Sequence, residues 1–248
     1  MKVILVGYGS MGREVEKILR ERNHTVAAKI DTAKIEGTSD VLTENMATGA
    51  DVAIEFSTSN AVLPNAEKYS KIGLNAIVGT TGWYSRINEL KAILGKSGIG
   101  YLYGSNFSIG AQIFFKIIAY ASRLTESFPQ YDILGYEIHH KRKKDSPSGT
   151  AHSIAEIILK NNSRKKKIVT EKLNRAIEKD ELHFASVRGG EIPGIHTVLL
   201  DSYADTIQLT HSARNRGGFA LGAVLAAEWI QGKSGIFTVN NFIDSILK

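Results

Sequence analysis

Short apolar runs alternate with longer amphipathic segments along the first hundred residues of the chain. The runs predict buried strands, because four to six hydrophobic residues bounded by glycine or polar residues are typical of a parallel sheet. They occupy 2–6, 25–30, 51–56, 75–78 and 99–103. The segments between them carry apolar residues at helical spacing. Repeated strand–helix units of this kind predict an α/β fold of the Rossmann type, with a doubly wound parallel sheet.

The pattern changes after residue 109. Two helices are expected, at 112–124 and 148–161, among strands that have glycine, proline or aspartate turns between them. These strands are expected at 131–138, 184–188, 195–200 and 206–211. Several strands with few helices predict a second domain of α+β type. A helix at 217–229 and an apolar segment at 242–247 follow, and composition leaves open whether they rejoin the first sheet.

A glycine-rich turn joins the first strand to the first helix. Gly7, Gly9 and Gly12 form G-x-G-x-x-G, and the helix after them carries Val15 and Leu19 on one face. In this context the three glycines permit a tight turn, close approach of a pyrophosphate, and close packing of helix on strand. Asp31 ends the second strand, where an acid can bind the ribose hydroxyls. The alternative is a structural strand–helix–strand unit with an incidental acid.

Polar and glycine residues also follow the later strands. They occur at 57–59, 79–82 and 105–108. Each could be an ordinary turn, but ligands of doubly wound sheets bind at the carboxyl ends of the strands. Their shared edge therefore favours a binding site.

The stretch from Glu137 to Ala151 combines two histidines, His139 and His140, with the cations 141–144 and a turn into a helix. Ser148 is a candidate N-cap, and N–H groups at a helix N-terminus beside cations form a site for a carboxylate or phosphate. Histidines titrate near neutral pH and can transfer a proton. The alternative is a solvated basic loop with an ordinary helix cap.

Other charged and titratable residues suggest less. The run Arg164–Lys167 is interpreted as a solvated loop, and His183, His196 and His211 as structural histidines, because no metal-ligand spacing links them. The 248 residues contain no cysteine, which excludes disulfides, thiolate metal sites and cysteine nucleophiles. The chain begins with a predicted strand and has no apolar run of membrane length, so we expect a cytoplasmic enzyme or binding protein. The net charge of +6 suits an anionic ligand or nucleic acid.

With these motifs in place, the sequence resembles the 4-hydroxy-tetrahydrodipicolinate (dihydrodipicolinate) reductase family over nearly its whole length. The stretch 137–151, E-I-H-H-K-R-K-K-D-S-P-S-G-T-A, is similar to the family's E-x-H-H-x-x-K-x-D-x-P-S-G-T-A. Further similar segments lie at 78–82, 105–110, 186–198 and 216–220. The resemblance implies that a nicotinamide cofactor delivers hydride to a cyclic, unsaturated imine dicarboxylate, and that an added proton completes the reduction.

The resemblance also implies residue roles. His139 and Lys143 match the catalytic histidine and lysine, which are implicated in proton donation. The substrate-binding positions are His140, Ser148, Gly149 and Thr150. The cofactor positions, for NADH, NADPH or both, are Gly7, Tyr8, Gly9, Ser10, Met11, Gly12, Asp31, Gly79, Thr80, Thr81, Ser105, Asn106, Phe107, Ser108, Arg216 and Phe219. No metal is expected.

The sequence departs from the family where the cofactor's ribose is expected. The glycine loop lacks the arginine that commonly precedes Met11, and Thr32 stands where relatives that use NADPH often have a cation. A carboxylate without an adjacent cation disfavours a 2′-phosphate. Lys29 and Lys34 weaken this inference, because both are cations near Asp31 in the sequence. We expect NADH to be used at least as well as NADPH.

The expected organisation is a dinucleotide-binding domain formed by 1–106 plus 218–248, and a substrate-binding and oligomerisation domain at 107–217. The resemblance implies a homotetramer joined through the second domain's sheet, with no nucleic-acid or membrane partner. Two alternatives remain: another dehydrogenase of amino-acid metabolism, of the aspartate or homoserine type, and a non-enzymatic nucleotide-sensing or nucleic-acid-binding protein. The first would have no reason to combine His139, His140, Lys143 and Ser148–Thr150, and the second would bind DNA in a salt-dependent manner.

Overall fold

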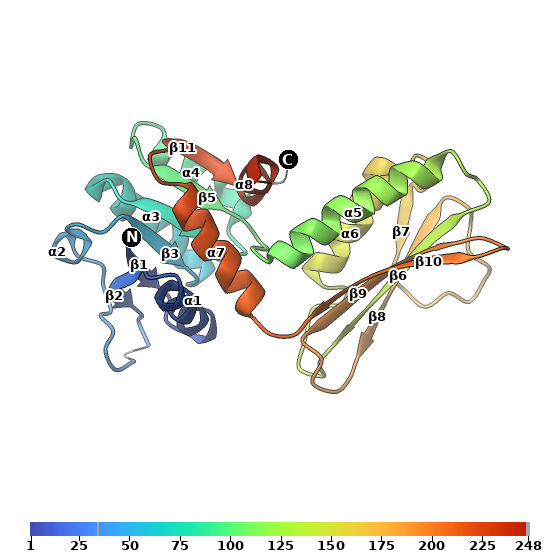
Figure 1. The fold of residues 1–248 in the computed structure, drawn as a ribbon, viewed down its shortest axis with the longest axis horizontal. Coiled ribbons are helices and arrows are strands. Elements are labelled where there is room, and N and C mark those ends of the chain that lie inside the picture. The colour runs from blue at the N-terminus through green and yellow to red at the C-terminus, as the bar shows by residue number, and fades with distance from the viewer. Residues whose placement is uncertain (34, 247–248) are drawn as a thin grey trace. The chain divides into compact units, whose positions relative to one another are not determined.

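The computed structural model describes residues 1–33 and 35–246. The chain divides into two compact units, and each is described by itself. The first unit contains Met1–Ile109 and the chain from Arg216 onward, and the second contains Gly110–Asn215 (Figure 1). The assignment of cofactor binding to one unit and of substrate binding and oligomerisation to the other stays a prediction.

A six-stranded sheet forms the first unit, and all its neighbouring strands are parallel. Its strands are β1 (Lys2–Val6), β2 (Thr25–Ile30), β3 (Val52–Glu55), β4 (Asn75–Val78), β5 (Gly100–Tyr103) and β11 (Gly235–Thr238). Their order is β11-β5-β4-β3-β1-β2. The chain therefore reverses its winding direction between β1 and β3, which is where doubly wound folds bind ligands.

Helices cover both faces of this sheet. Alternate side chains of β1 point to opposite faces, so Val3 and Leu5 join one core and Ile4 and Val6 join the other. The first core includes α1 (Ser10–Glu21), α7 (Gly217–Trp229) and α8 (Val239–Ile246). The second includes α3 (Val62–Ile72) and α4 (Ile87–Leu94). Short helical segments also occur, namely α2 (Glu44–Ala47), η1 (Ser59–Ala61) and η2 (Tyr84–Arg86).

The predicted α/β class is confirmed, with small differences. The amphipathic segment between β4 and β5 starts as the 3-10 turn η2 and continues as the short helix α4. Strand β11 was not predicted, and it pairs in parallel with β5. The C-terminal segments therefore rejoin the first sheet, a question that composition left open.

A five-stranded mixed sheet forms the second unit, in the order β10-β9-β6-β8-β7. Its strands are β6 (Asp132–His139), β7 (Lys167–Val169), β8 (Glu181–Arg188), β9 (Gly194–Asp201) and β10 (Thr206–Ala213). Strand β9 is antiparallel to both its neighbours, whereas β8 is parallel to β6 and β7. The helices α5 (Ile109–Glu126) and α6 (Gly149–Asn161) pack together on one face of this sheet (Figure 1).

The prediction of a solvated loop at Arg164–Lys167 is wrong for its first two residues. Lys165 is only 4% exposed, and its Nζ lies 2.6 Å from both the Asp132 carboxylate and the Glu181 carbonyl oxygen. The Arg164 guanidinium donates to the Thr125 carbonyl at 2.7 Å. These two cations connect the chain after α6 to β6, β8 and the end of α5. Their partners include backbone carbonyl groups of distant segments, which a sequence pattern does not reveal.

Within the described ranges, no helix combines the length and apolar character needed to cross a membrane.

Candidate functional site

The glycine loop between β1 and α1 has the geometry that its sequence predicts. Gly7 has φ +86°, and a Cβ there would lie 2.1 Å from the Phe56 carbonyl oxygen. A Cβ on Gly12 would lie 2.3 Å from the Gly7 carbonyl oxygen. Both positions therefore exclude any other residue. A Cβ on Gly9, the N-cap residue of α1, would meet nothing, so a ligand can approach the backbone there.

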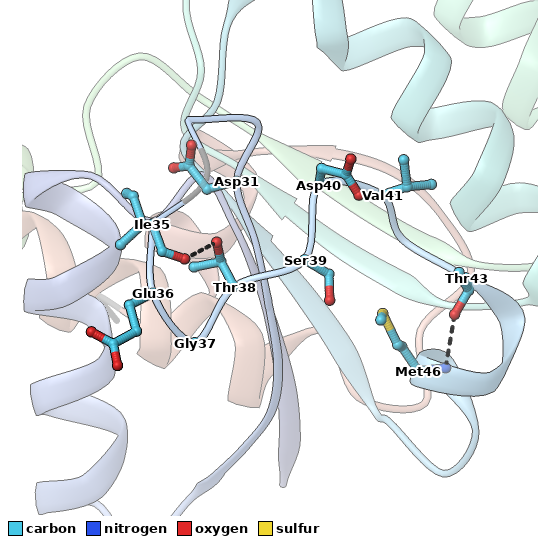
Figure 2. Close-up of a pocket in the computed structure, with 10 residues that line it drawn as sticks. All are labelled: Asp31, Ile35, Glu36, Gly37, Thr38, Ser39, Asp40, Val41, Thr43 and Met46. Atoms are coloured by element: carbon cyan, nitrogen blue, oxygen red, sulfur yellow. Dashed lines mark hydrogen bonds between the residues drawn. The ribbon is translucent and has the colours of Figure 1, made fainter.

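Asp31 fastens this loop to the end of β2. Its Oδ2 accepts from the Tyr8 N–H at 2.7 Å, and its Oδ1 accepts from the Ala33 N–H at 2.8 Å. Each oxygen has a further lone pair for a ribose hydroxyl. Asp31 also lines a pocket formed by the following segment, in which Glu36 and Asp40 add two more carboxylates (Figure 2). Lys34, which opposed the cofactor inference, lies outside the described residues.

A charged network lies behind the glycine loop. The Tyr8 hydroxyl donates to the Glu16 carboxylate, and Lys29 Nζ lies 2.9 Å from the same carboxylate. Burial alone would raise the pKa of Glu16, but hydrogen bonds from Tyr8, Lys29 and Arg20 outweigh it and lower the pKa to about 2. Lys29 therefore forms an ion pair with Glu16 within the unit, and this pairing makes it a less favourable ligand for a 2′-phosphate.

The remaining cofactor positions lie at the ends of other elements in this unit. The buried Thr80 accepts from the Ser57 N–H at 2.8 Å, which joins the ends of β3 and β4. Phe107 is 2% exposed in the core, so its backbone and not its ring is available to a cofactor. Gly79 lies against the Phe56 ring, and Arg216 is the N-cap residue of α7. Thr81, Ser105 and Ser10 are exposed, Asn106, Met11 and Phe219 are half-buried, and Ser108 is buried.

The second unit places a fully buried carboxylate, Glu137, near the end of β6. Its Oε1 accepts from the Ser148 N–H at 2.8 Å, the Ser186 hydroxyl at 2.9 Å and the Arg188 guanidinium at 2.7 Å. Its Oε2 accepts from the Ser148 hydroxyl. Burial alone would raise the pKa of Glu137, but hydrogen bonds from His196, Ser148 and Arg188 outweigh it and lower the pKa. Glu137 is therefore a buried anion.

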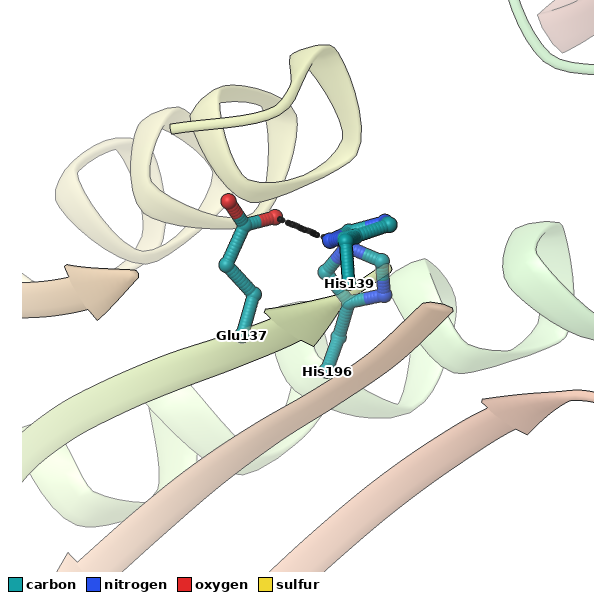
Figure 3. Close-up of side chains that lie close together, drawn as sticks. All are labelled: Glu137, His139 and His196. Atoms are coloured by element: carbon teal, nitrogen blue, oxygen red, sulfur yellow. Dashed lines mark ion pairs between the residues drawn. The ribbon is translucent and has the colours of Figure 1, made fainter. Parts of the chain in front are cut away.

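Two histidines contact this anion (Figure 3). His139 Nδ1 and His196 Nε2 each lie 3.3 Å from Glu137 Oε2. Both rings are buried, at 6% and 5% exposed. Burial lowers the pKa of His139 to about 4, and the neighbouring cations reinforce this effect against the opposing influence of Glu137. His139 is therefore neutral at pH 7.

These three side chains offer metal-ligand atoms within 4.8 Å of one another. The donors around the carboxylate argue against a metal ion there. Ser148, Ser186 and Arg188 already bind Glu137, and the Arg188 guanidinium would repel a cation. The arrangement fits a hydrogen-bonded carboxylate better than a metal ligand.

The basic loop after β6 is compensated by acids. Lys143 Nζ lies 2.8 and 2.9 Å from the two oxygens of Asp145, and Arg142 pairs with Glu191 at 2.5 Å. The His140 N–H donates to the Ile192 carbonyl at 2.8 Å, which anchors the start of the loop. The side chain of Lys143 is 22% exposed, so it is partly accessible to a ligand.

Helix α6 begins where the sequence predicts. Ser148 is its N-cap, and its hydroxyl oxygen accepts from the Ala151 N–H at 3.1 Å. Gly149 is exposed, and a Cβ there would meet nothing within 4 Å. Thr150 follows in the same turn, half-buried. An anion can therefore approach the first turn of α6, beside Glu137 and the histidines.

Sequence analysis missed three members of this cluster, Ser186, Arg188 and His196. Strand register explains why they belong to it: Glu137 lies opposite His196 in β9 and beside Ser186 in β8, and His139 lies beside Arg188. The strands expected at 184–188, 195–200 and 206–211 are shorter than the observed β8, β9 and β10, and their register was not predicted. Alternation of side chains in β6, β8 and β9 would have found the cluster once the pairing was known.

Comparison with known proteins gives the family. A model of the N-terminal part of dihydrodipicolinate reductase matches residues 1–107, and a model of its C-terminal part matches residues 110–243. This chain belongs to the dihydrodipicolinate reductase family. A 4-hydroxy-tetrahydrodipicolinate reductase of Christiangramia forsetii is 36% identical over 249 residues, covering 100% of both chains. Another, from Archaeoglobus fulgidus, is 37% identical over 202 residues, covering 79% of this chain and 76% of that one.

A solved structure agrees with the fold. The dipicolinate-bound dihydrodipicolinate reductase from Paenisporosarcina sp. TG-14 superimposes with a TM-score of 0.76 at 21% identity, covering 96% of this chain and 97% of that one. The predicted family and enzyme class, an oxidoreductase that uses a nicotinamide cofactor, are thereby confirmed. The roles of individual residues stay predictions.

Proposed function

We propose that this protein reduces 4-hydroxy-tetrahydrodipicolinate (dihydrodipicolinate) to tetrahydrodipicolinate in the diaminopimelate and lysine pathway. The observation that carries the proposal is the cluster at the end of β6, where a buried anion, a histidine and a helix N-terminus meet in a chain of this family. No contact among the described residues favours a dehydrogenase of the aspartate or homoserine type.

The second unit would bind the substrate's carboxylates. The first turn of α6 is open at Gly149, and Thr150 adds a hydroxyl in the same turn. Oriented N–H groups and the helix dipole favour an anion there. His140 and Lys143 border the site on the loop after β6. The related reductase from Paenisporosarcina binds dipicolinate, a ring with two carboxylates, which supports a substrate of this class.

His139 and Lys143 would supply the proton. When bound, the nicotinamide cofactor would supply a hydride to a ring carbon, and one proton would balance the reduction of dihydrodipicolinate. Starting from the 4-hydroxy compound, the hydroxyl group also leaves as water. Lys143 is a cation held by Asp145, and cations near the ring stabilise the negative charge that arrives with the hydride. A general acid at this position is worth about 10²–10⁴-fold in rate.

The first unit would bind the cofactor through the glycine loop, Asp31 and the other strand-end positions. Two observations support use of NADH at least as well as NADPH. Asp31, Glu36 and Asp40 line the pocket beside β2, and their negative charges disfavour a phosphate there, while Lys29 is paired with Glu16. Thr32 offers only a hydroxyl.

A homotetramer in the cytoplasm completes the proposal. Leu134, Tyr136 and Ile138 alternate with the buried residues of β6 and are only partly covered, and Val187 of β8 is 51% exposed. This face of the sheet lies opposite α5 and α6, and a second copy could cover it. Light scattering that shows a monomer at micromolar concentration would count against the assembly.

The reductase activity can be tested directly. Purified protein is given NADH, pyruvate and aspartate semialdehyde, with dihydrodipicolinate synthase to generate the substrate in place. Oxidation of NADH should require the synthase, and omission of either synthase substrate is the control. Absence of oxidation with both NADH and NADPH would refute the proposed function.

A further inference from the structure

We propose that Glu137 is a positioning residue, which holds His139 in the tautomer protonated on Nδ1 and so makes Nε2 the nitrogen that exchanges a proton with the substrate. The inference deepens the proposed function and rests on it for the role of the substrate. Its structural part, the tautomer, concerns this chain's own residues alone.

The argument starts from Ser148, whose hydroxyl has one hydrogen to donate and two lone pairs. It donates to Glu137 Oε2, which as a carboxylate oxygen can only accept. It accepts from the Ala151 N–H at 3.1 Å, and His196 Nε2 lies 3.2 Å away. His196 must therefore carry its hydrogen on Nε2, which fills the second lone pair.

The reverse arrangement is unfavourable. If His196 Nε2 were bare and accepted from Ser148, Glu137 Oε2 would lose its hydroxyl donor and face a nitrogen lone pair at 3.3 Å. Glu137 would keep its partners on Oε1, but a buried carboxylate oxygen that loses its donor is unfavourable. One arrangement of protons therefore satisfies Ser148 and Glu137 together.

The tautomer of His139 follows from the same carboxylate. Its Nδ1 lies 3.3 Å from Oε2, a contact too poorly aligned to count as a regular hydrogen bond. The electrostatic preference remains, because a bare Nδ1 would place its lone pair against a buried anion. Nδ1 therefore carries the hydrogen, and Nε2 is left for the proton that is exchanged. Oriented carboxylates hold histidines in this way in hydrolase triads.

Charged and titratable groups face His139 from three strands and one loop. Glu137 faces it from β6, Arg188 from β8, His196 from β9 and Lys143 from the loop after β6. Arg188 and Lys143 disfavour a positive ring in the free protein. A substrate with two carboxylates would offset these cations, so the ring gains its proton most readily when the substrate is bound. Glu137 also binds the Ser148 N–H, and one carboxylate thus positions both the proton carrier and the first turn of α6.

The test measures tautomers in the full-length protein by nitrogen NMR of ¹⁵N-labelled histidine rings, with the His139 signals assigned by their loss in His139→Asn. Wild-type protein at pH 7 should show His139 protonated on Nδ1, and Glu137→Gln should shift it to the Nε2–H form or a mixture. Ser186→Ala is the matched control, because it removes a donor from Oε1 and leaves the oxygen that faces Nδ1. This control should keep the wild-type tautomer.

A second readout uses turnover. Glu137→Gln should lower kcat by about 10²–10⁴-fold, the range of general acid catalysis, with a much smaller change in the KM for NADH. Wild-type His139 protonated on Nε2, or an unchanged tautomer in Glu137→Gln, would overturn the proposal. If Glu137→Gln fails to fold, the wild-type spectrum alone decides. The spectra need no substrate, so a protein without reductase activity would refute the proposed function and leave the tautomer testable.

Discussion

At the scale of single residues, the loop after β6 offers the most direct prediction. His139→Ala and Lys143→Ala should each lower kcat by about 10²–10⁴-fold, since each removes a group expected to supply the proton. Cofactor binding should change far less, and titration of NADH fluorescence measures it. Arg142→Ala is the comparison, because Arg142 belongs to the same loop but is exposed and bound by Glu191. Near wild-type turnover in both variants would mean that the loop has been misassigned.

A second residue prediction concerns the space beside His139. A Cβ on Gly194 would lie 2.9 Å from His139 Nε2, closer than non-bonded carbon and nitrogen atoms approach. Gly194→Ala should displace the ring and lower kcat by about tenfold or more, since small misplacements of catalytic groups are costly. Gly189→Ala is the matched control, because the Gly189 N–H binds the His139 carbonyl but a Cβ there would meet nothing within 4 Å. Equal turnover in the two variants would show that the ring is not constrained.

The lowered pKa of His139 predicts how stability depends on pH. Between the ordinary pKa of 6.5 and the folded value of about 4, the unfolded ring binds a proton that the folded ring does not. Protons then favour the unfolded state, so the stabilising contribution is complete above pH 6.5 and is lost as pH falls toward 4. Between pH 7 and pH 5 this amounts to about 2 kcal/mol. Urea unfolding at pH 7 and pH 5 measures this difference in the free energy of unfolding. In His139→Asn the difference between the two pH values should be smaller by that amount, and an unchanged difference would contradict the lowered pKa of His139.

At the scale of elements, Lys165 provides a test of how α6 is joined to the sheet. Lys165→Ala removes an ammonium that binds Asp132 and the carbonyls of Lys179 and Glu181. Two carbonyls lose their donor, so the free energy of unfolding should fall by about 2–4 kcal/mol. Lys166→Ala, at an exposed neighbouring position, should stay within about 0.5 kcal/mol of wild type. Urea unfolding of the two variants gives the comparison, and equal stabilities would support the solvated loop after all.

Elements also show how far sequence reasoning reaches. Hydrophobic patterns located five of the six strands of the parallel sheet, and residue type located the N-cap at Ser148, because those signals are local. Sequence reasoning failed at Lys165, where the partners are backbone carbonyls from distant segments. It did not reveal that His196, interpreted as a structural histidine, contacts Glu137, because that contact depends on the pairing of β6 with β9. Catalytic candidates inside one motif were accessible from sequence, whereas the residues that orient them depend on strand register.

At the scale of the whole molecule, the choice of cofactor is the main open prediction. We expect kcat/KM with NADH to be at least equal to that with NADPH, because three carboxylates line the pocket beside β2 and Lys29 is paired. Steady-state kinetics with both cofactors measure the ratio. A preference of about tenfold or more for NADPH, equivalent to about 1.4 kcal/mol of transition-state binding, would contradict the expectation. Glu36→Gln is a better probe than Asp31→Ala, since Asp31 also holds the Tyr8 N–H of the glycine loop.

The strand β11 has a consequence for how the protein is made. The first unit needs α7, β11 and α8, which are synthesised only after the entire second unit. Once residues 1–215 have emerged from the ribosome, the chain contains a complete mixed sheet with its helices, but the parallel sheet still lacks α7, β11 and α8. Val3, Leu5 and Ile54 are then exposed to other nascent chains and to chaperones. The order of synthesis thus makes the substrate-binding candidate the first unit able to fold, and leaves the glycine loop on an unfinished core until translation is nearly complete.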